Sequence, residues 1–116
     1  MEVKENVVVT LSFKFALEII KYCECLQENK KFVIANQLLK SGTSIGANIR
    51  EAQNAESKAD FVHKFKISAK EIEETLYWLD LCRYSEGYPN IGNLPTELET
   101  ISRIVNKIII TTKQKQ

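Results

Sequence analysis

Residues 57–79 read SKADFVHKFKISAKEIEETLYWL, and their apolar side chains recur at the spacing of one face of a helix. Ser57 and Asp60 have the spacing of a capping box, so the helix should begin at about residue 58. Gly87 suits the left-handed cap at its end, and the predicted helix spans residues 58–86. Its core face consists of Phe61, Phe65, Ser68, Ala69, Ile72, Leu76 and Leu79.

Three more amphipathic segments predict further helices on the same grounds. They cover about residues 10–29, 32–55 and 94–112. Thr10 or Ser12 is expected to cap the first of them and Asn93 the last, where Pro95 suits the first turn. The first helix carries a core stripe of Leu11, Phe15, Ile19, Tyr22 and Leu26, widened by Ala16, Leu17, Ile20 and Cys23.

Sparse turn signals decide how these helices are arranged. The 116 residues include only four glycines and two prolines, and both prolines fall in one short stretch, so few long elements are expected. No alternating strand pattern separates the helices. The sequence therefore predicts one domain over residues 1–116, an all-α, antiparallel up-down-up-down four-helix bundle.

The second predicted helix has two neighbouring stripes. An apolar stripe holds Leu38, Gly42, Ile45, Ile49 and Ala52, and beside it run Ser41, Ser44, Asn48, Glu51 and Ala55. Glycine inside a helix is unfavourable by about 1 kcal/mol relative to alanine, but it permits the close approach of another backbone. We interpret Gly42-x-x-x-Gly46 as a tight helix contact and not as a break.

Charge and composition exclude several classes of protein. The formal net charge is +1, with 16 basic and 15 acidic residues, so a nucleic-acid site would have to be a local basic patch. The N-terminus lacks the pattern of a signal peptide, and no apolar run approaches the roughly 20 residues of a membrane span. Three cysteines without an export signal favour reduced thiols. We expect a cytoplasmic protein without a membrane partner.

No motif in the chain predicts catalysis. Asp60-x-x-His63 has the spacing of a di-iron motif, but such a centre repeats that motif on two helices and this chain has one histidine. The side chains of Cys23 and Cys25 would point about 200° apart on a helix, so they could not coordinate the same metal ion. The nucleophile elbow and the phosphate loop are both absent. We expect no enzyme activity, metal, cofactor or small-molecule substrate.

The third predicted helix has an unusual order of charges. Lysines dominate its first half and acids its second, which opposes the helix dipole. One hypothesis is head-to-tail docking between subunits, and the alternative is an ordinary solvated face. Tyr77, Trp78 and Tyr84 flank its core stripe. Three roles fit these aromatic side chains. They could anchor an interface with another protein, stack on unpaired bases, or enlarge the edge of the core.

Four segments of the sequence together resemble the 23S ribosomal RNA intervening-sequence protein family. They are QLLKSGTSIGANIREA at 37–52, SKADF at 57–61, EETLYWL at 73–79 and FALEII at 15–20. The resemblance implies a bacterial four-helix bundle that assembles as a ring-shaped homopentamer, and it implies no molecular activity. A related branch, the accessory proteins of diversity-generating retroelements, is basic and binds nucleic acid and a reverse transcriptase. This chain departs from that branch in its near-neutral charge.

The family's signature falls on the polar stripe of the second helix and on the Glu–Tyr–Trp segment of the third. The resulting candidates for a functional or interface cluster are Asn48, Arg50, Glu51, Glu74 and Trp78. Asn48 and Glu51 need hydrogen-bond partners if they are buried, and Tyr77, Trp78 and Arg50 are candidate donors.

Two functions remain open at this point. The first is a non-enzymatic, ring-forming homo-oligomer that works as an adaptor for RNA or for an RNA-binding protein. Such a protein should gather its basic side chains on one surface, and the candidates are Arg50, Lys58, Lys64, Lys66 and Lys70. The alternative is a protein-binding scaffold with no nucleic-acid role, which should expose an apolar patch instead.

Overall fold

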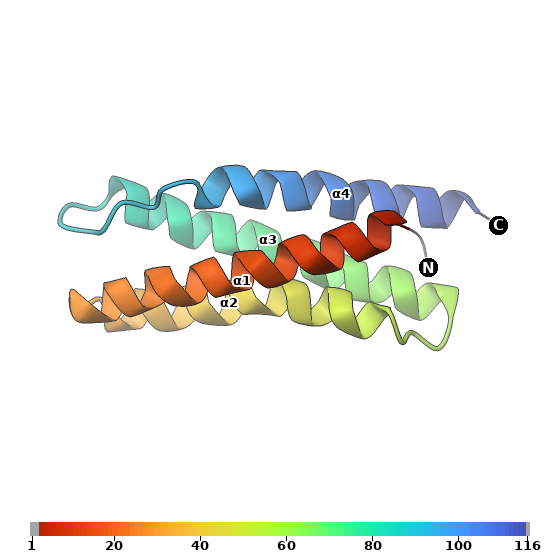
Figure 1. Ribbon diagram of the computed structural model, residues 1–116, viewed down its shortest axis with the longest axis horizontal. Coiled ribbons are helices and arrows are strands. Elements are labelled where there is room, and N and C mark those ends of the chain that lie inside the picture. Colours follow the sequence, from red (N-terminus) through yellow and green to blue (C-terminus); the bar gives the residue numbers. More distant parts are fainter. Residues whose placement is uncertain (1–2, 116) are drawn as a thin grey trace.

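The computed structural model describes residues 3–115 and contains four helices in that range. They are α1 (Val3–Glu28), α2 (Phe32–Ala52), α3 (Lys58–Tyr84) and α4 (Leu94–Gln114). The chain reverses direction at each connection, so successive helices are antiparallel and both termini lie at the same end of the bundle (Figure 1). The predicted all-α four-helix bundle is confirmed. None of the described helices is long and apolar enough to cross a membrane.

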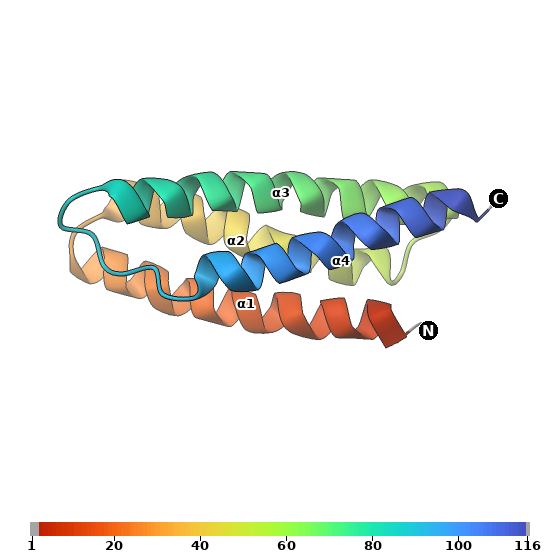
Figure 2. The same cartoon turned by 90° about the horizontal axis from the view of Figure 1, so that it is seen from above.

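The four helices stand at the corners of an elongated bundle of 50 × 21 × 19 Å. Each helix packs against two others, giving the contacts α1·α2, α2·α3, α3·α4 and α1·α4. Within the described residues, no Cα atom of α1 lies within 8 Å of one in α3, and the same holds for α2 and α4. Figure 2 shows the same arrangement from above. The outer faces of α1 and α3 therefore lie at opposite corners.

The core fills the space between the four helices with mostly aliphatic side chains. Its largest fully buried members are Val8, Phe15, Ile19, Leu26, Leu38, Ile45, Ile49, Phe65, Ile72, Leu79, Leu98 and Ile101. The stripe predicted for α3 is buried at Phe65, Ser68, Ile72 and Leu79, whereas Phe61, Ala69 and Leu76 are only partly buried. Ser12, Ser41, Ser68 and Thr75 are buried polar residues in the same interior.

The glycines of α2 mark its closest approach to α1, and α2 continues through both of them. A Cβ atom at Gly42 would lie 2.9 Å from both Cγ atoms of Ile19. A Cβ atom at Gly46 would lie 3.2 Å from the Ser12 Oγ atom and 3.3 Å from the Ser12 carbonyl oxygen. The prediction of a tight helix contact at these two positions is confirmed.

The first two helices differ from their predicted bounds. α1 begins at Val3 instead of residue 10, and the predicted caps Thr10 and Ser12 lie inside it. Ser12 is buried, and its hydroxyl donates to the Val9 carbonyl oxygen at 3.2 Å. α2 ends at Ala52 instead of residue 55, because the next three N–H groups bond to carbonyls three residues back and form a turn.

The capping prediction for α3 is confirmed at its start, where the Ser57 hydroxyl accepts a 3.0 Å bond from the Asp60 N–H. Its end is corrected: α3 stops at Tyr84, since Ser85 is already extended. Gly87 has the expected positive φ of 78°, but it lies in the loop and not at the helix terminus. Before α4, the Asn93 side chain makes no capping bond, and Pro95 occupies the first turn as predicted.

Candidate interaction surfaces

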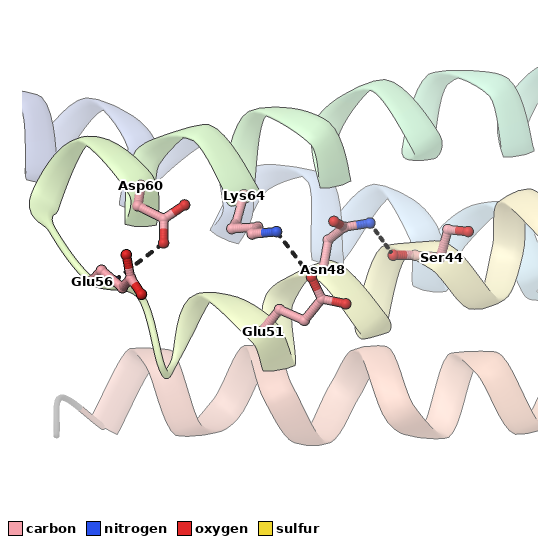
Figure 3. A network of polar contacts seen from close by, with 6 residues as sticks. All are labelled: Ser44, Asn48, Glu51, Glu56, Asp60 and Lys64. Atoms are coloured by element: carbon pink, nitrogen blue, oxygen red, sulfur yellow. Dashed lines mark hydrogen bonds and ion pairs between the residues drawn. The ribbon is translucent and has the colours of Figure 1, made fainter.

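Asn48 and Glu51 lie on the side of α2 that faces the start of α3 (Figure 3). The Asn48 side-chain amide donates to the Ser44 carbonyl oxygen at 2.9 Å, within its own helix. The Glu51 carboxylate accepts from the Lys64 ammonium at 3.0 Å, and this bond is the main cause of a raised pKa for Lys64. Lys64, and none of the predicted donors, therefore pairs with Glu51.

Arg50 points to a different side of α2, toward α1. Its guanidinium lies 5.5 Å from the centre of the Phe13 ring, within the range of a cation–π contact. Both residues line a groove of about 370 Å³ between α1 and α2, whose α2 side also includes the small residues Gly46 and Ala47. Arg50 is thus separated from Asn48 by the width of its own helix.

Glu74, Tyr77 and Trp78 form a second group farther along α3. The Trp78 indole donates to the Glu74 carboxylate at 3.2 Å, and the Tyr77 ring meets the Trp78 ring edge-on at 5.2 Å. Contacts between α2 and α3 join Glu51 to Lys64 and Ser41 to Thr75. The Glu74–Trp78 group therefore lies about 15 Å along the bundle from Asn48 and Glu51. The structure divides the predicted cluster into two groups.

The predicted basic set is also divided. Lys64 is paired with Glu51 and Arg50 lies over Phe13. Lys66 and Lys70 are exposed one turn apart on α3, and neither makes an ion pair or a hydrogen bond with the described side chains of residues 7–115. Lys58, at the start of α3, is exposed as well, so three of the five predicted basic side chains remain available for phosphate contacts.

An unexpected apolar surface lies on α1. Phe13, Leu17 and Ile20 are between 38% and 50% exposed, and their spacing of four and three residues places them on one helix face. We call these residues the α1 stripe. The prediction that Leu17 and Ile20 widen the core stripe is wrong, because α1 has only α2 and α4 as neighbours and its third side faces solvent.

A matching surface lies on α3. Tyr77, Leu81 and Tyr84 follow the same spacing of four and three residues, and they are between 38% and 78% exposed. We call these residues the α3 stripe. Trp78 is half-buried against the core instead. The α1 and α3 stripes lie on helices at opposite corners of the bundle.

The α1 stripe borders a groove between α1 and α4 with a volume of about 650 Å³. Leu11, Leu17, Ile20 and Ile101 give it an apolar lining. Its charged lining residues are Lys14, Glu18, Lys21 and Glu97. The groove continues toward the loop before α4, because a second hollow of about 340 Å³ shares Glu18, Lys21 and Glu97 with it.

The sequence contained a signal for the α1 stripe that periodicity alone did not resolve. Apolar residues in the first helix occupy two faces, one through Phe15 and Ile19 and the other through Phe13 and Leu17. A helix at a bundle corner can bury only about one of these faces. The excess of apolar residues therefore indicated an exposed surface, without showing which face it was.

The cysteines lie mainly in the interior. Cys23 and Cys82 are buried and Cys25 is partly exposed. Burial, with a smaller effect of Cys82, raises the pKa of Cys23 to about 12. No group of three or more His, Cys, Asp or Glu side chains suited to holding a metal ion occurs among the side chains of residues 7–115.

Comparisons with known proteins give a family and similar solved structures. Residues 4–107 match the family described as 23S rRNA-intervening sequence protein. A crystal structure from Bacteroides thetaiotaomicron VPI-5482, described as a protein with unknown function from the S23 ribosomal protein family, is 41% identical. The match covers 93% of this chain and 99% of that one, with a TM-score of 0.86. No curated protein matches.

Proposed function

Because the chain belongs to the 23S rRNA-intervening sequence protein family, we propose that it is a non-enzymatic interaction protein that assembles with its own copies into a ring and acts as a protein-binding scaffold. The observation that supports this proposal is the pair of exposed apolar stripes on α1 and α3. Regular exposed stripes of this kind are typical of surfaces that bind other proteins.

The position of the two stripes favours a ring over a symmetric dimer. Two different surfaces at opposite corners can join head to tail, and repeated head-to-tail contacts close into a ring when the rotation permits. Tyr77 and Tyr84 suit such a contact because each offers a large apolar ring and a polar hydroxyl.

The test is the mass of the protein in solution. We expect light scattering and native mass spectrometry to give one closed multiple of the 13.3 kDa subunit mass over a wide range of protein concentrations. A subunit mass that persists at high micromolar concentration would overturn the proposal.

RNA association is a second candidate, supported by the family description and by the free ammonium groups of Lys66 and Lys70. Fluorescence anisotropy with a structured ribosomal RNA fragment should then show binding at near-physiological salt. Replacing Lys66 and Lys70 by Gln should weaken it, whereas Lys107→Gln on α4 serves as the matched control. Binding that vanishes at physiological salt would leave the protein scaffold as the function.

A further inference from the structure

We propose that the α3 stripe of one copy docks in the α1–α4 groove of the next copy, an inference that rests on the proposed self-assembly and specifies its interface. The groove has an apolar floor that the helices of its own chain leave uncovered, with Leu17 and Ile20 exposed there. The α3 stripe is a second regular apolar surface at a bundle corner, and the part of the chain that the structure describes leaves its three side chains 38% to 78% exposed.

The two surfaces match in length. The α3 stripe runs from Tyr77 to Tyr84, which is seven residues or about 10 Å of helix. The α1 side of the groove runs from Leu11 to Ile20, about 13 Å of helix. A helix face bearing Tyr77, Leu81 and Tyr84 can therefore lie along α1 with Tyr77 over the floor, while Leu81 and Tyr84 reach past Ile20 toward the hollow before α4.

The charges beside the two surfaces are complementary. Lys14 and Lys21 line the groove seven residues apart, so both point from one side of α1 about 10 Å from each other. Glu73 and Asp80 flank the α3 stripe with the same separation of seven residues, and both are exposed. With the helices side by side, Lys14 can face Glu73 while Lys21 faces Asp80.

The remaining groove charges fit the same docking. Lys21 is 3.6 Å from Glu18, but both side chains are at least half exposed, so this ion pair is weak and exchangeable. Glu18 and Glu97 place negative charge near the loop end of the groove. Arg83, exposed on the docking helix between Leu81 and Tyr84, brings a positive charge to that end.

The direction of the helices agrees with a closed ring. Matching Lys14 to Glu73 and Lys21 to Asp80 makes α1 of one copy run parallel to α3 of the next. α1 and α3 also run parallel within one chain (Figure 1). All copies then point the same way, as subunits related by rotation about an axis along the bundles must do.

Charge reversal tests this interface. One variant carries Lys14→Glu with Lys21→Glu, and a second carries Glu73→Lys with Asp80→Lys. Each places like charges across the interface, so each should weaken self-association by about a hundredfold or more. Combining all four substitutions restores the opposite charges and should restore the wild-type mass. Lys107→Glu, an exposed charge reversal on α4, is the matched control.

The outcomes separate this interface from the broader proposal. If wild-type protein forms a multimer and both double reversals keep its mass, another surface forms the ring and the docking proposal is overturned. If the wild-type protein is a monomer, self-assembly itself is overturned. Circular dichroism of each variant shows that it is folded, and Leu17→Ser and Leu81→Ser, which remove apolar contact without changing charge, should also reduce the mass.

Discussion

Gly42 is the position where α1 and α2 tolerate the least additional volume. The Cβ atom of an alanine would lie 2.9 Å from both Cγ atoms of Ile19, which is fully buried and stiff about its first side-chain torsion. The helices would have to separate to admit one methyl group.

We predict that Gly42→Ala destabilises the protein by about 1–3 kcal/mol, although alanine favours a helix by roughly 1 kcal/mol over glycine. Urea unfolding measures the change. In an Ile19→Ala background the same substitution should be less harmful, because the colliding atoms are gone. A stabilised Gly42→Ala protein would show that the two helices are not in close contact.

Glu71 is a partly buried carboxyl beside Glu74. Burial, followed by repulsion from Glu74, raises the pKa of Glu71, and attraction to Lys40 offsets only part of this effect. A raised pKa in the folded state means that ionisation is less favourable after folding, so stability falls as pH rises through that pKa.

Glu71→Gln should therefore stabilise the protein at pH 7, and the gain should disappear at acidic pH, where the wild-type carboxyl is protonated. Urea unfolding at pH 7 and pH 3 tests this expectation. Glu56→Gln, at an exposed position between α2 and α3, serves as the control for the loss of one negative charge. A gain that is equal at both pH values would contradict the assigned cause.

The three cysteines should differ in reactivity. The high pKa and burial of Cys23, and the burial of Cys82, disfavour the reactive thiolate, whereas Cys25 is partly exposed. We predict one iodoacetamide adduct per folded chain at pH 7.5, at Cys25, and three after unfolding. Mild oxidation should not join Cys23 to Cys82, since the Cα atoms of α1 and α3 are more than 8 Å apart.

At the scale of elements, buried hydroxyl groups connect α2 to α3. The Ser68 hydroxyl donates to the Ile45 carbonyl oxygen at 3.1 Å. The Thr75 hydroxyl lies 2.9 Å from the Ser41 hydroxyl and 2.7 Å from the Glu71 carbonyl oxygen. These bonds form only in one register of the two helices, because a shift would leave buried polar groups unpaired.

Thr75→Val keeps the shape of the side chain. It leaves the Ser41 hydroxyl with only a long hydrogen bond of 3.4 Å to the Leu38 carbonyl oxygen. We expect a loss of about 1–2 kcal/mol in unfolding free energy. Adding Ser41→Ala should recover part of that loss. Thr100→Val, the same substitution at an exposed position of α4, should change stability by less than roughly 0.5 kcal/mol.

The number of helices and the buried face of each could be predicted from the sequence, because apolar residues recur at helical spacing many times along each helix. The start of α1 could not be predicted, since the Val7-Val8-Val9 run is β-branched and its helicity depends on the burial of Val8 in the core. The separation of Asn48 from Trp78 was not predictable for another reason. It depends on the register of α2 against α3, which a few buried hydroxyls determine and no periodicity reveals.

At the scale of the whole molecule, the loop between α3 and α4 is attached to the opposite side of the bundle. The Tyr22 hydroxyl, on α1, donates to the Pro89 carbonyl oxygen at 2.8 Å. The Lys31 ammonium lies 4.8 Å from the centre of the Tyr88 ring. Burial, with a further effect of Cys82, raises the pKa of Tyr22, so the phenol stays protonated and keeps its donor.

Tyr22→Phe should cost about 1 kcal/mol of stability and increase hydrogen exchange in residues 85–93. Heat unfolding and exchange mass spectrometry measure the two effects. Tyr84→Phe, at an exposed hydroxyl, is the control and should change neither. Unchanged exchange in Tyr22→Phe would mean that other contacts hold the loop.

The close contact between α1 and α2 also constrains how the family can evolve. A chain that replaces Gly42 by a larger residue must make room at position 19, and a chain with a side chain at position 46 must move the backbone at Ser12. Positions 19 and 42 should therefore covary among homologous sequences, with the sum of their side-chain volumes nearly constant. Position 46 should vary little, because no neighbouring side chain can be shortened to compensate for a backbone contact.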